Sequence, residues 1–236
     1  MIVLSPVAGR LRGKVIDFFF PRYCVGCGKN GDFLCPECRQ TIPRILPPFC
    51  QRCGKPEASG GLCVSCWGVR SDLDGVRSPF RFDGVIRRAV HELKYHNVKA
   101  LAGCLAELIA DYLESNPVLG EVLIPVPLHP RRLRQRGYNQ SGLLAAELGS
   151  LMSLPVIEDS LRRVEDSLPQ AKAASVEERW RNVKDAFACP AGVLVSKQVI
   201  LLDDVCTTGA TLEAAAIALK AAGASLVWGV TLARET

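Results

Sequence analysis

The sequence predicts an α/β protein with a mainly parallel sheet flanked by helices, preceded by a small N-terminal metal-binding module. Two observations lead to this fold class. From about residue 76 onward, short apolar runs alternate with segments of helical periodicity, which is typical of parallel sheets covered by helices. Before that point, cysteines occur in regularly spaced pairs. We therefore expect two parts, an N-terminal module over residues 1–72 and an α/β domain over residues 73–236.

The overall composition is that of a soluble globular protein. Hydrophobic residues make up 48% of the 236 residues and charged residues 22%. No apolar run reaches the roughly 20 residues of a transmembrane helix. Residues 1–20 are interrupted by charges and lack a signal-peptide pattern, and we expect a short amphipathic helix there that packs on its own protein. These features predict no membrane insertion and a cytoplasmic location.

The N-terminal module carries eight of the chain's 11 cysteines, arranged as four Cys-x-x-Cys pairs. The pairs are Cys24/Cys27, Cys35/Cys38, Cys50/Cys53 and Cys63/Cys66. Two such pairs supply the four thiolates of a closed tetrahedral zinc site, so we predict two structural Zn²⁺ ions that this segment needs in order to fold. Disulfides or a redox function are the alternative, but four regular pairs exceed what a redox motif needs.

The sequence leaves the pairing of these ligands open. Sequential sites, 24/27/35/38 and 50/53/63/66, are the simplest arrangement, and a cross-braced arrangement fits the same spacing. Two tetrathiolate zinc sites would also lower the formal net charge of +5 to about +1. The global charge therefore gives no argument for binding nucleic acid. Cys104 and Cys206 stand apart from the pairs: Cys104 lies in an Ala/Leu-rich helix and is expected to pack in the core, whereas Cys206 lies in a turn where small residues fit and is not expected to be a catalytic thiol.

The α/β part begins with a strand expected over residues 75–82. The helix after it, over 85–95, places its apolar residues on one face: Val85, Ile86, Ala89, Val90 and Leu93. Periodicity then predicts the remaining elements in order: a helix over 99–114, a strand over 122–126, a helix over 142–152, a short strand over 155–157, a strand over 198–202, a helix over 211–222 and a last strand over 226–232.

Residues 162–182 are polar and lack a clean period, although they lie between predicted strands. Such a segment fits a mobile lid that excludes water from a reactive sugar centre. A charged surface loop with a short helix explains the same residues equally well.

The strand over 198–202 leads into residues suited to a sugar phosphate. Asp203 and Asp204 follow it and are placed to accept hydrogen bonds from vicinal ribose hydroxyls or to steer a hydrated Mg²⁺. The next residues form a turn at a helix N-terminus, where backbone N–H groups and the helix dipole favour an anion: Thr207, Thr208, Gly209, Ala210 and Thr211. Simple capping by a threonine is the alternative, but capping requires no acidic pair.

A basic segment follows the strand over 122–126. It contains Arg131, Arg132, Arg134 and Arg136, whose guanidinium groups match phosphate geometry. We expect a pyrophosphate-binding loop here, with His129 as a possible further ligand contact and Tyr138 able to stack on a base. The alternative is a solvated basic face, or a helix start capped by Asn139.

These segments together closely resemble the ComF family over almost the whole chain. The resemblance rests on the four cysteine pairs, Leu93-Lys94-Tyr95, the run from Pro125 through Gln140, the segment from Gln170 to Asn182, and the run from Asp203 to Thr211. It implies a type I phosphoribosyltransferase-like domain behind a double zinc ribbon. The expected ligand is phosphoribosyl pyrophosphate (PRPP) or another ribose 5-phosphate compound with Mg²⁺, and Lys94 joins the expected contacts. The chain departs from the family at Asn97, Ser167 and Ala173.

Three functions fit this resemblance. The first is a transferase that moves the phosphoribosyl group to an acceptor and releases pyrophosphate, with catalysis expected at Asp203, Asp204 and Arg136. Its PRPP contacts would be Asp203, Asp204, Thr207, Thr208, Gly209, Ala210, Thr211, Arg131, Arg132 and Lys94. The second is a competence-type binding module for single-stranded DNA. The third is a regulator that senses PRPP and signals through the zinc module to a helicase or another DNA-uptake protein. The sequence identifies no acceptor and leaves open whether the domain is an active enzyme.

Overall fold

The computed structural model describes residues 22–164 and 186–235. The helix expected within residues 1–20 and most of the lid segment, including Ser167 and Ala173, lie outside the described residues. Just beside that segment, β4 (Arg162–Arg163) pairs antiparallel with β5 (Phe187–Ala188). Among the residues that are described, no helix has the length and apolar character needed to cross a membrane.

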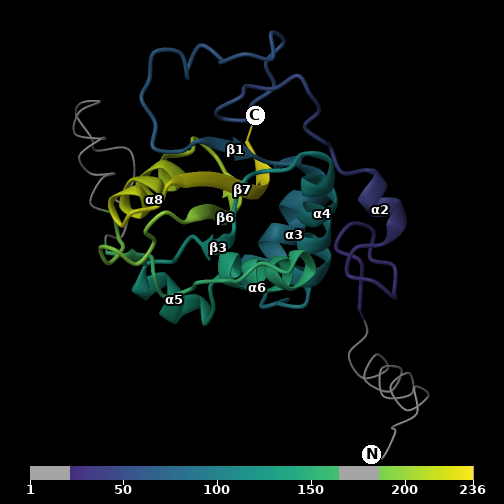
Figure 1. Cartoon of the computed structure of the whole chain (residues 1–236). Coiled ribbons are helices and arrows are strands. Elements are labelled where there is room, and N and C mark those ends of the chain that lie inside the picture. Colours follow the sequence, from purple (N-terminus) through teal and green to yellow (C-terminus); the bar gives the residue numbers. More distant parts are fainter. Residues whose placement is uncertain (1–21, 165–185, 236) are drawn as a thin grey trace, which may run out of the picture.

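A parallel sheet forms the centre of the molecule (Figure 1). Its strand order is β1 (Gly75–Arg77), β7 (Leu226–Arg234), β6 (Gln198–Cys206) and β3 (Val122–Pro125). A short fifth strand, β2 (Phe80–Arg81), also pairs with β7. Every pair in this sheet is parallel, which confirms the predicted fold class of a mainly parallel sheet flanked by helices.

Helices cover both faces of the sheet, so the domain has three layers (Figure 1). The helices α3 (Gly84–Tyr95), α4 (Leu101–Ser115) and α6 (Gln140–Met152) share a core with one face, and α8 (Ala210–Ala221) shares a second core with the other. Alternate residues of β6 divide between the cores. Ile200 and Leu202 join the first, and Val199 and Leu201 join the second. The apolar face predicted for α3 is buried as expected.

Three predicted strands differ from the structure. The strand expected over 75–82 is divided into β1 and β2, because Ser78 bonds to Thr231 through their hydroxyls at 2.6 Å and Pro79 has no N–H to pair. The strand expected over 155–157 is a single bridge between Val156 and Leu123. The strand expected to end at residue 202 runs to Cys206, because its pairing with β7 continues.

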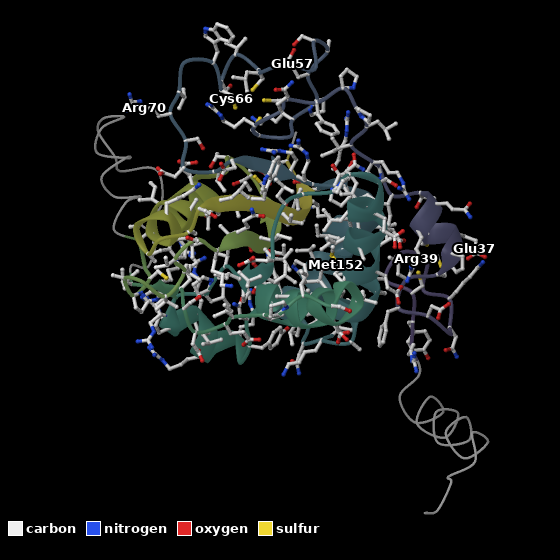
Figure 2. The ribbon with its side chains drawn as sticks, viewed as in Figure 1. Glu37, Arg39, Glu57, Cys66, Arg70 and Met152 are labelled. Atoms are coloured by element: carbon white, nitrogen blue, oxygen red, sulfur yellow. The ribbon has the colours of Figure 1, made fainter. Side chains whose placement is uncertain are left out.

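The two cysteine-rich segments lie against different parts of the domain. The first, which includes α2 (Pro36–Gln40), buries Leu34 and Cys38 in the same core as α3 and α4. The second lies beside β1, where the N–H of Val76 donates to the carbonyl of Arg52 at 2.6 Å. Figure 2 shows Glu37 and Arg39 of the first segment at one side of the molecule, and Glu57, Cys66 and Arg70 of the second above the sheet. The boundary between residues 72 and 73 stays a prediction.

Asn97, one of the departures from the family, has a φ of 59°. This left-handed region favours glycine, and asparagine is among the few other residues that enter it readily. The replacement is therefore compatible with the backbone that follows α3.

Candidate functional site

The acidic pair was expected to follow a strand that ends at residue 202, but it lies within β6, which continues to Cys206. Asp203 and Asp204 are both buried. The carboxylate of Asp203 accepts hydrogen bonds from the hydroxyl of Ser141 at 2.7 Å and from the N–H of Asp204 at 2.9 Å. Asp204 forms an ion pair with Lys94 of α3. Two helices on one face of the sheet thus hold the carboxylates: α3 contacts Asp204 through the ammonium of Lys94, and α6 contacts Asp203 through the hydroxyl of Ser141.

The two carboxylates therefore have different surroundings. Burial and the nearby charge of Asp204 together raise the pKa of Asp203 to about 7, although the hydrogen bond from Ser141 opposes the rise. The only cation bonded to the pair among the described residues is Lys94, and it contacts Asp204. Near neutral pH, Asp203 therefore lies close to the point where it gains or loses a proton.

The residues after the pair form an accessible turn. Cys206 is buried at the end of β6, whereas Thr207 and Thr208 are exposed. Gly209 has a φ of 88°, which a residue with a side chain rarely adopts, and α8 begins directly after it. The hydroxyl of Thr208 accepts from the N–H of Ala210 at 3.3 Å, so the capping expected as the alternative is present. Capping accounts for Thr208 but not for the buried acidic pair behind it.

The arginine-rich segment forms a short helix, α5 (Pro130–Arg136), instead of the predicted loop. His129 begins it, since its Nδ1 accepts the N–H of Arg131 at 3.3 Å, and Gly137 ends it with a φ of 81°. The imidazole thus has a capping role, and no ligand is needed to explain it. The helix follows β3, which lies next to β6, so the arginines lie at the same edge of the sheet as the acidic pair.

The arginines of α5 fall into two groups. Arg131, Arg132 and Arg134 are exposed. Arg136 is half-buried, with its guanidinium 5.3 Å from the ring centre of Tyr95 and a hydrogen bond to the side chain of Gln140. Because Tyr95 follows Lys94 on α3, Arg136 is held close to the helix that contacts Asp204. The catalytic role expected for Arg136 stays a prediction.

The prediction that Tyr138 stacks on a base is wrong for this structure. The side chain is buried, and its hydroxyl donates to the carbonyl of Leu93. The ammonium of Lys99 lies 4.7 Å from the ring centre. Tyr138 instead fastens the segment after α5 to α3. Sequence reasoning also missed Ser141, whose only local signal is its place at the start of α6, directly after the run of residues that carries the family resemblance.

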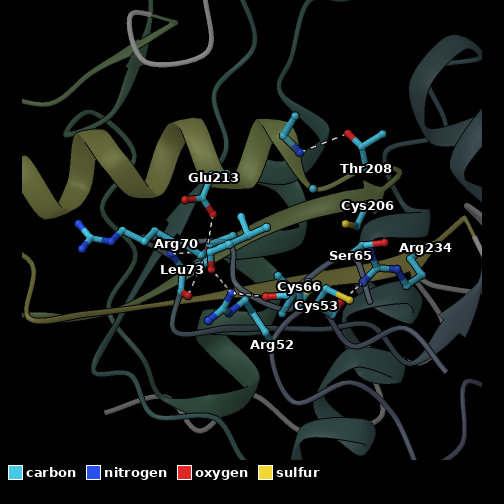
Figure 3. A pocket seen from close by; sticks show the side chains of 15 residues that line it. Arg52, Cys53, Ser65, Cys66, Arg70, Leu73, Cys206, Thr208, Glu213 and Arg234 are labelled. Atoms are coloured by element: carbon cyan, nitrogen blue, oxygen red, sulfur yellow. Dashed lines mark hydrogen bonds between the residues drawn. The ribbon is translucent and has the colours of Figure 1, made fainter. Parts of the chain in front are cut away.

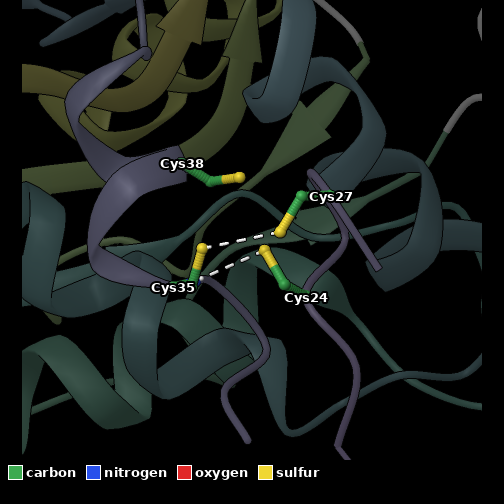
Figure 4. Close-up of side chains that lie close together, drawn as sticks. All are labelled: Cys24, Cys27, Cys35 and Cys38. Carbon is green, nitrogen blue, oxygen red and sulfur yellow. Dashed lines mark hydrogen bonds between the residues drawn. The ribbon is translucent and has the colours of Figure 1, made fainter. Parts of the chain in front are cut away.

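The cysteines form two separate clusters with sequential membership. One contains Cys24, Cys27, Cys35 and Cys38, and the other contains Cys50, Cys53, Cys63 and Cys66. Figure 4 shows the four sulfurs of the first cluster turned toward one another. The structure thus favours the simpler of the two pairings left open by the sequence.

Both clusters fit a zinc ion. The Sγ atoms of Cys27 and Cys35 are 3.7 Å apart, as are those of Cys53 and Cys63. Two thiolates bound to one tetrahedral Zn²⁺ at ~2.3 Å would lie ~3.8 Å apart. Backbone N–H groups also point at one sulfur of each cluster, from Cys35 to Cys24 at 3.4 Å and from Cys63 to Cys50 at 3.3 Å.

The same N–H groups favour thiolates in these clusters. Burial opposes ionisation of Cys24 and Cys50, but the backbone hydrogen bonds outweigh it and lower the pKa of each thiol to about 6. Burial raises the pKa of Cys38, Cys53 and Cys66. A divalent cation would allow all four thiols of a cluster to ionise, because its charge offsets their mutual repulsion.

The other cysteines of the described residues agree with packing roles. Burial raises the pKa of Cys104 to about 11, and it raises the pKa of Cys206 and Cys189 as well. Thiols of this kind are poor nucleophiles.

A cavity of about 310 Å³ separates the second cysteine segment from the turn before α8 (Figure 3). Its walls include Cys53 and Cys66 on one side and Gly209 and Glu213 on the other, and neither aspartate of the acidic pair lines it. Arg234, at the end of β7, is fully buried at the cavity's edge and donates to the carbonyl of Cys53. Because Arg234 pairs in register with Cys206, this contact joins the second metal cluster to the strand that carries the acidic pair.

Sequence comparison finds relatives with names linked to DNA uptake and use. Competence protein F of Haemophilus influenzae is 29% identical over 231 residues, which cover 91% of this chain and 99% of that protein. Competence protein ComFC of Bacillus subtilis is 27% identical over 215 residues, 88% of this chain and 86% of that protein. DNA utilization protein YhgH of Salmonella typhimurium is 28% identical over 200 residues, 82% of this chain and 87% of that protein.

A family model described as a double zinc ribbon domain matches residues 15–67. Together with the relatives, this match confirms the resemblance to the ComF family. The two cysteine clusters are accordingly called the first ribbon (Cys24 to Cys38) and the second ribbon (Cys50 to Cys66) below.

Solved structures similar to this chain include phosphoribosyltransferases. A glutamine PRPP amidotransferase from B. subtilis complexed with ADP and GMP is 19% identical over 56% of this chain and 26% of that chain, with a TM-score of 0.39. A purine phosphoribosyltransferase from Pyrococcus horikoshii is 21% identical over 56% of this chain and 73% of that chain, with a TM-score of 0.35. At these TM-scores the similarities are too distant to support an argument about ligands.

The sequential pairing predicts the zinc content of two double variants. Cys27→Ser/Cys38→Ser removes two ligands of the first ribbon and should retain one tightly bound ribbon zinc ion, whereas Cys27→Ser/Cys53→Ser removes one ligand from each ribbon and should retain no ribbon zinc. Cross-braced sites, with residues 24/27 sharing an ion with 50/53, would give the opposite result. Elemental analysis of the purified, folded chains after removal of loosely bound metal distinguishes the two.

The raised pKa of Asp203 predicts a pH-dependent stability. The folded state binds this proton more tightly than the unfolded state does, because the pKa moves from 3.8 to about 7. The free energy of unfolding therefore falls as the pH rises from about 4 through 7 and levels off above. Between pH 5 and pH 8, the free energy of unfolding of the wild type should fall relative to that of Asp203→Asn by on the order of 2 kcal/mol, because one pKa unit corresponds to about 1.4 kcal/mol.

Chemical denaturation at the two pH values measures this gain. Asp111→Asn, at an exposed position of α4, is the matched control and should follow the wild type at both. A constant difference between wild type and Asp203→Asn would show that this carboxyl does not titrate in the interval.

Proposed function

We propose that this chain binds PRPP, or a related ribose 5-phosphate compound, at the carboxyl edge of β6. The observation that carries the proposal is the buried pair of Asp203 and Asp204 directly before an exposed turn at the N-terminus of α8. Ligands of parallel α/β sheets bind at this edge. The ComF-family resemblance supports the same ligand class.

The acidic pair suits the sugar part of such a ligand. Burying two adjacent carboxylates costs free energy, and Lys94 and Ser141 offset only part of it. Vicinal ribose hydroxyls would supply two further donors to these oxygens. Carboxylate oxygens also fit Mg²⁺, and Asp203 and Asp204 are the residues that would hold it, directly or through water; the ion would neutralise charge on the pyrophosphate.

The turn suits the 5′-phosphate. Thr207 and Thr208 are exposed and lie directly before α8, whose first N–H groups form the positive end of the helix dipole. Gly209, with its positive φ, leaves the backbone open to a close approach. Thr211, half-buried in the first turn of α8, is the remaining member of the proposed phosphate site.

If the bound sugar reacts, the acceptor's lone pair forms a bond to the anomeric carbon while the bond to pyrophosphate breaks, and pyrophosphate leaves with the electron pair. Arg136, Arg131 and Arg132 of α5 would stabilise the charge that develops on this leaving group. Asp203 and Asp204 would orient the ribose and stabilise positive charge on its ring. Binding of the sugar phosphate does not depend on which acceptor reacts, so we propose binding first and transfer second.

Calorimetric titration of PRPP with Mg²⁺ into the zinc-loaded chain tests the proposal. Wild type should bind, and Asp203→Asn/Asp204→Asn should lose at least tenfold in affinity, because neutral amides cannot replace the carboxylates as acceptors and cation ligands. Asp111→Asn should bind like wild type. Binding by neither wild type nor control would overturn the proposal, and equal binding by the double variant would move the sugar site away from β6.

A second function is favoured by the surface of the second ribbon. Trp67 is 76% exposed there and Val64 is 92% exposed, although both lie next to buried or half-buried cysteines. An exposed aromatic side chain followed three residues later by the exposed Arg70 suits single-stranded DNA, whose bases stack on the ring while its phosphates contact the cation. The relatives named for competence and DNA utilization support this use of the surface, as they support docking of a helicase or another DNA-uptake protein.

Titration of a labelled single-stranded oligonucleotide tests DNA binding. The affinity should fall steeply as salt rises. Trp67→Ala should weaken it by about 1–3 kcal/mol, the usual value of one base stacked on an aromatic ring. Leu119→Ala, which removes another exposed apolar side chain outside both ribbons, should leave the affinity unchanged. Salt-insensitive binding, or an unchanged affinity for Trp67→Ala, would exclude this contact.

A further inference from the structure

We infer that the chain has a third metal site, formed by His91, Glu92 and His96 at the C-terminal end of α3, for a divalent transition-metal ion such as Zn²⁺. The chain has only three histidines, and two of them lie in this cluster. The site is separate from both ribbons and does not depend on the proposed binding of PRPP.

The three side chains already lie close enough to share an ion. One ligand atom from each lies within 4.8 Å of the others. The Nδ1 atom of His96 is 2.9 Å from a carboxylate oxygen of Glu92, and the ring centres of His91 and His96 are 5.1 Å apart. Ligands bound to one tetrahedral ion at 2.0–2.2 Å lie ~3.4 Å apart, so small side-chain rotations would complete the site.

The donor set points to a particular class of metal. Two imidazoles and one carboxylate suit zinc, cobalt and nickel, whereas magnesium and calcium prefer oxygen ligands alone. Three protein ligands leave a position for water, as in open zinc sites. The side chains of His96 and Glu92 are 54% and 33% exposed, so an ion from solvent can reach them.

The backbone also favours a cation at this place. His96 is the residue that ends α3, and its N–H donates to the carbonyl of Glu92 at 3.1 Å. The carbonyl end of a helix carries partial negative charge. Three of the neighbouring cations have other partners, because Lys94 is paired with Asp204, Lys99 lies over Tyr138 and Arg88 donates to the carbonyl of Gly26.

A simpler account covers only part of the cluster. A hydrogen bond between His96 and Glu92, four residues apart on one helix, explains that pair without any metal. A ring contact with Tyr95 at 4.8 Å explains the position of His91. Neither contact requires all three ligand atoms to meet in one place, whereas a shared ion does.

The site lies next to the candidate ligand site. Tyr95 lies between His91, at 4.8 Å between ring centres, and the guanidinium of Arg136, at 5.3 Å. An ion that holds His91 would therefore also restrict the ring on which Arg136 lies.

Metal stoichiometry tests this inference. An untagged, full-length chain with both ribbons filled is dialysed against micromolar Zn²⁺, and bound zinc is then measured. Wild type should hold three zinc ions per chain, and His91→Gln/His96→Gln should hold two. His129→Gln changes the remaining histidine, which lies outside the cluster, and should hold three. Co²⁺ added to the wild type before this dialysis, with zinc in the two ribbons alone, should bind without the thiolate-to-metal absorption that a ribbon site would produce.

Two results would overturn the inference: a wild type that holds only two ions, or a third ion that persists in the double variant. Thermal unfolding of each chain, measured with and without added Zn²⁺, separates loss of the metal site from loss of the fold. The double variant should unfold like wild type in the absence of added metal, and only the wild type and His129→Gln should gain stability when Zn²⁺ is added.

Discussion

The parallel pairing of β6 with β7 is the interaction on which the rest of the site depends. It continues past the apolar part of β6 to the pair of Cys206 with Arg234, so the backbone of Asp203 and Asp204 belongs to the sheet. The strand then leads directly into the turn at the start of α8. The same pairing places Arg234 where its guanidinium reaches Cys53, which connects the second ribbon to this edge of the sheet.

The electrostatics of the site follow from burial. Ionising two adjacent buried carboxylates costs free energy. The ammonium of Lys94 and the hydroxyl of Ser141 offset part of this cost. This leaves Asp203 near its titration point at neutral pH. A ligand that brings hydrogen-bond donors or a cation would stabilise the two buried carboxylates. This is why we propose a sugar phosphate with Mg²⁺ as the ligand.

The two zinc ribbons have different places in the structure. The first contributes Cys24, Leu34 and Cys38 to the core shared with α3 and α4, so its metal supports the domain itself. The second lies over the sheet edge, leaves Trp67 exposed and borders the cavity beside α8. A partner that binds the second ribbon would therefore lie close to the proposed ligand site, and Arg234 connects the ribbon to the strand that carries the acidic pair.

The sequence alone determined the features that depend on local pattern: the parallel α/β class, the buried face of α3, the two sets of zinc ligands and the acidic pair with its turn. These signals are short in range, because periodicity, cysteine spacing and turn chemistry act within a few residues; the cysteine spacing identifies the eight zinc ligands but not which four share an ion. Only the tertiary structure decided the contacts between distant segments. The ion pair of Lys94 with Asp204, the bond from Ser141 and the burial of Tyr138 under Lys99 arise because three helices pack on one face of the sheet, and the sequential pairing of the ribbons arises because each segment closes on itself.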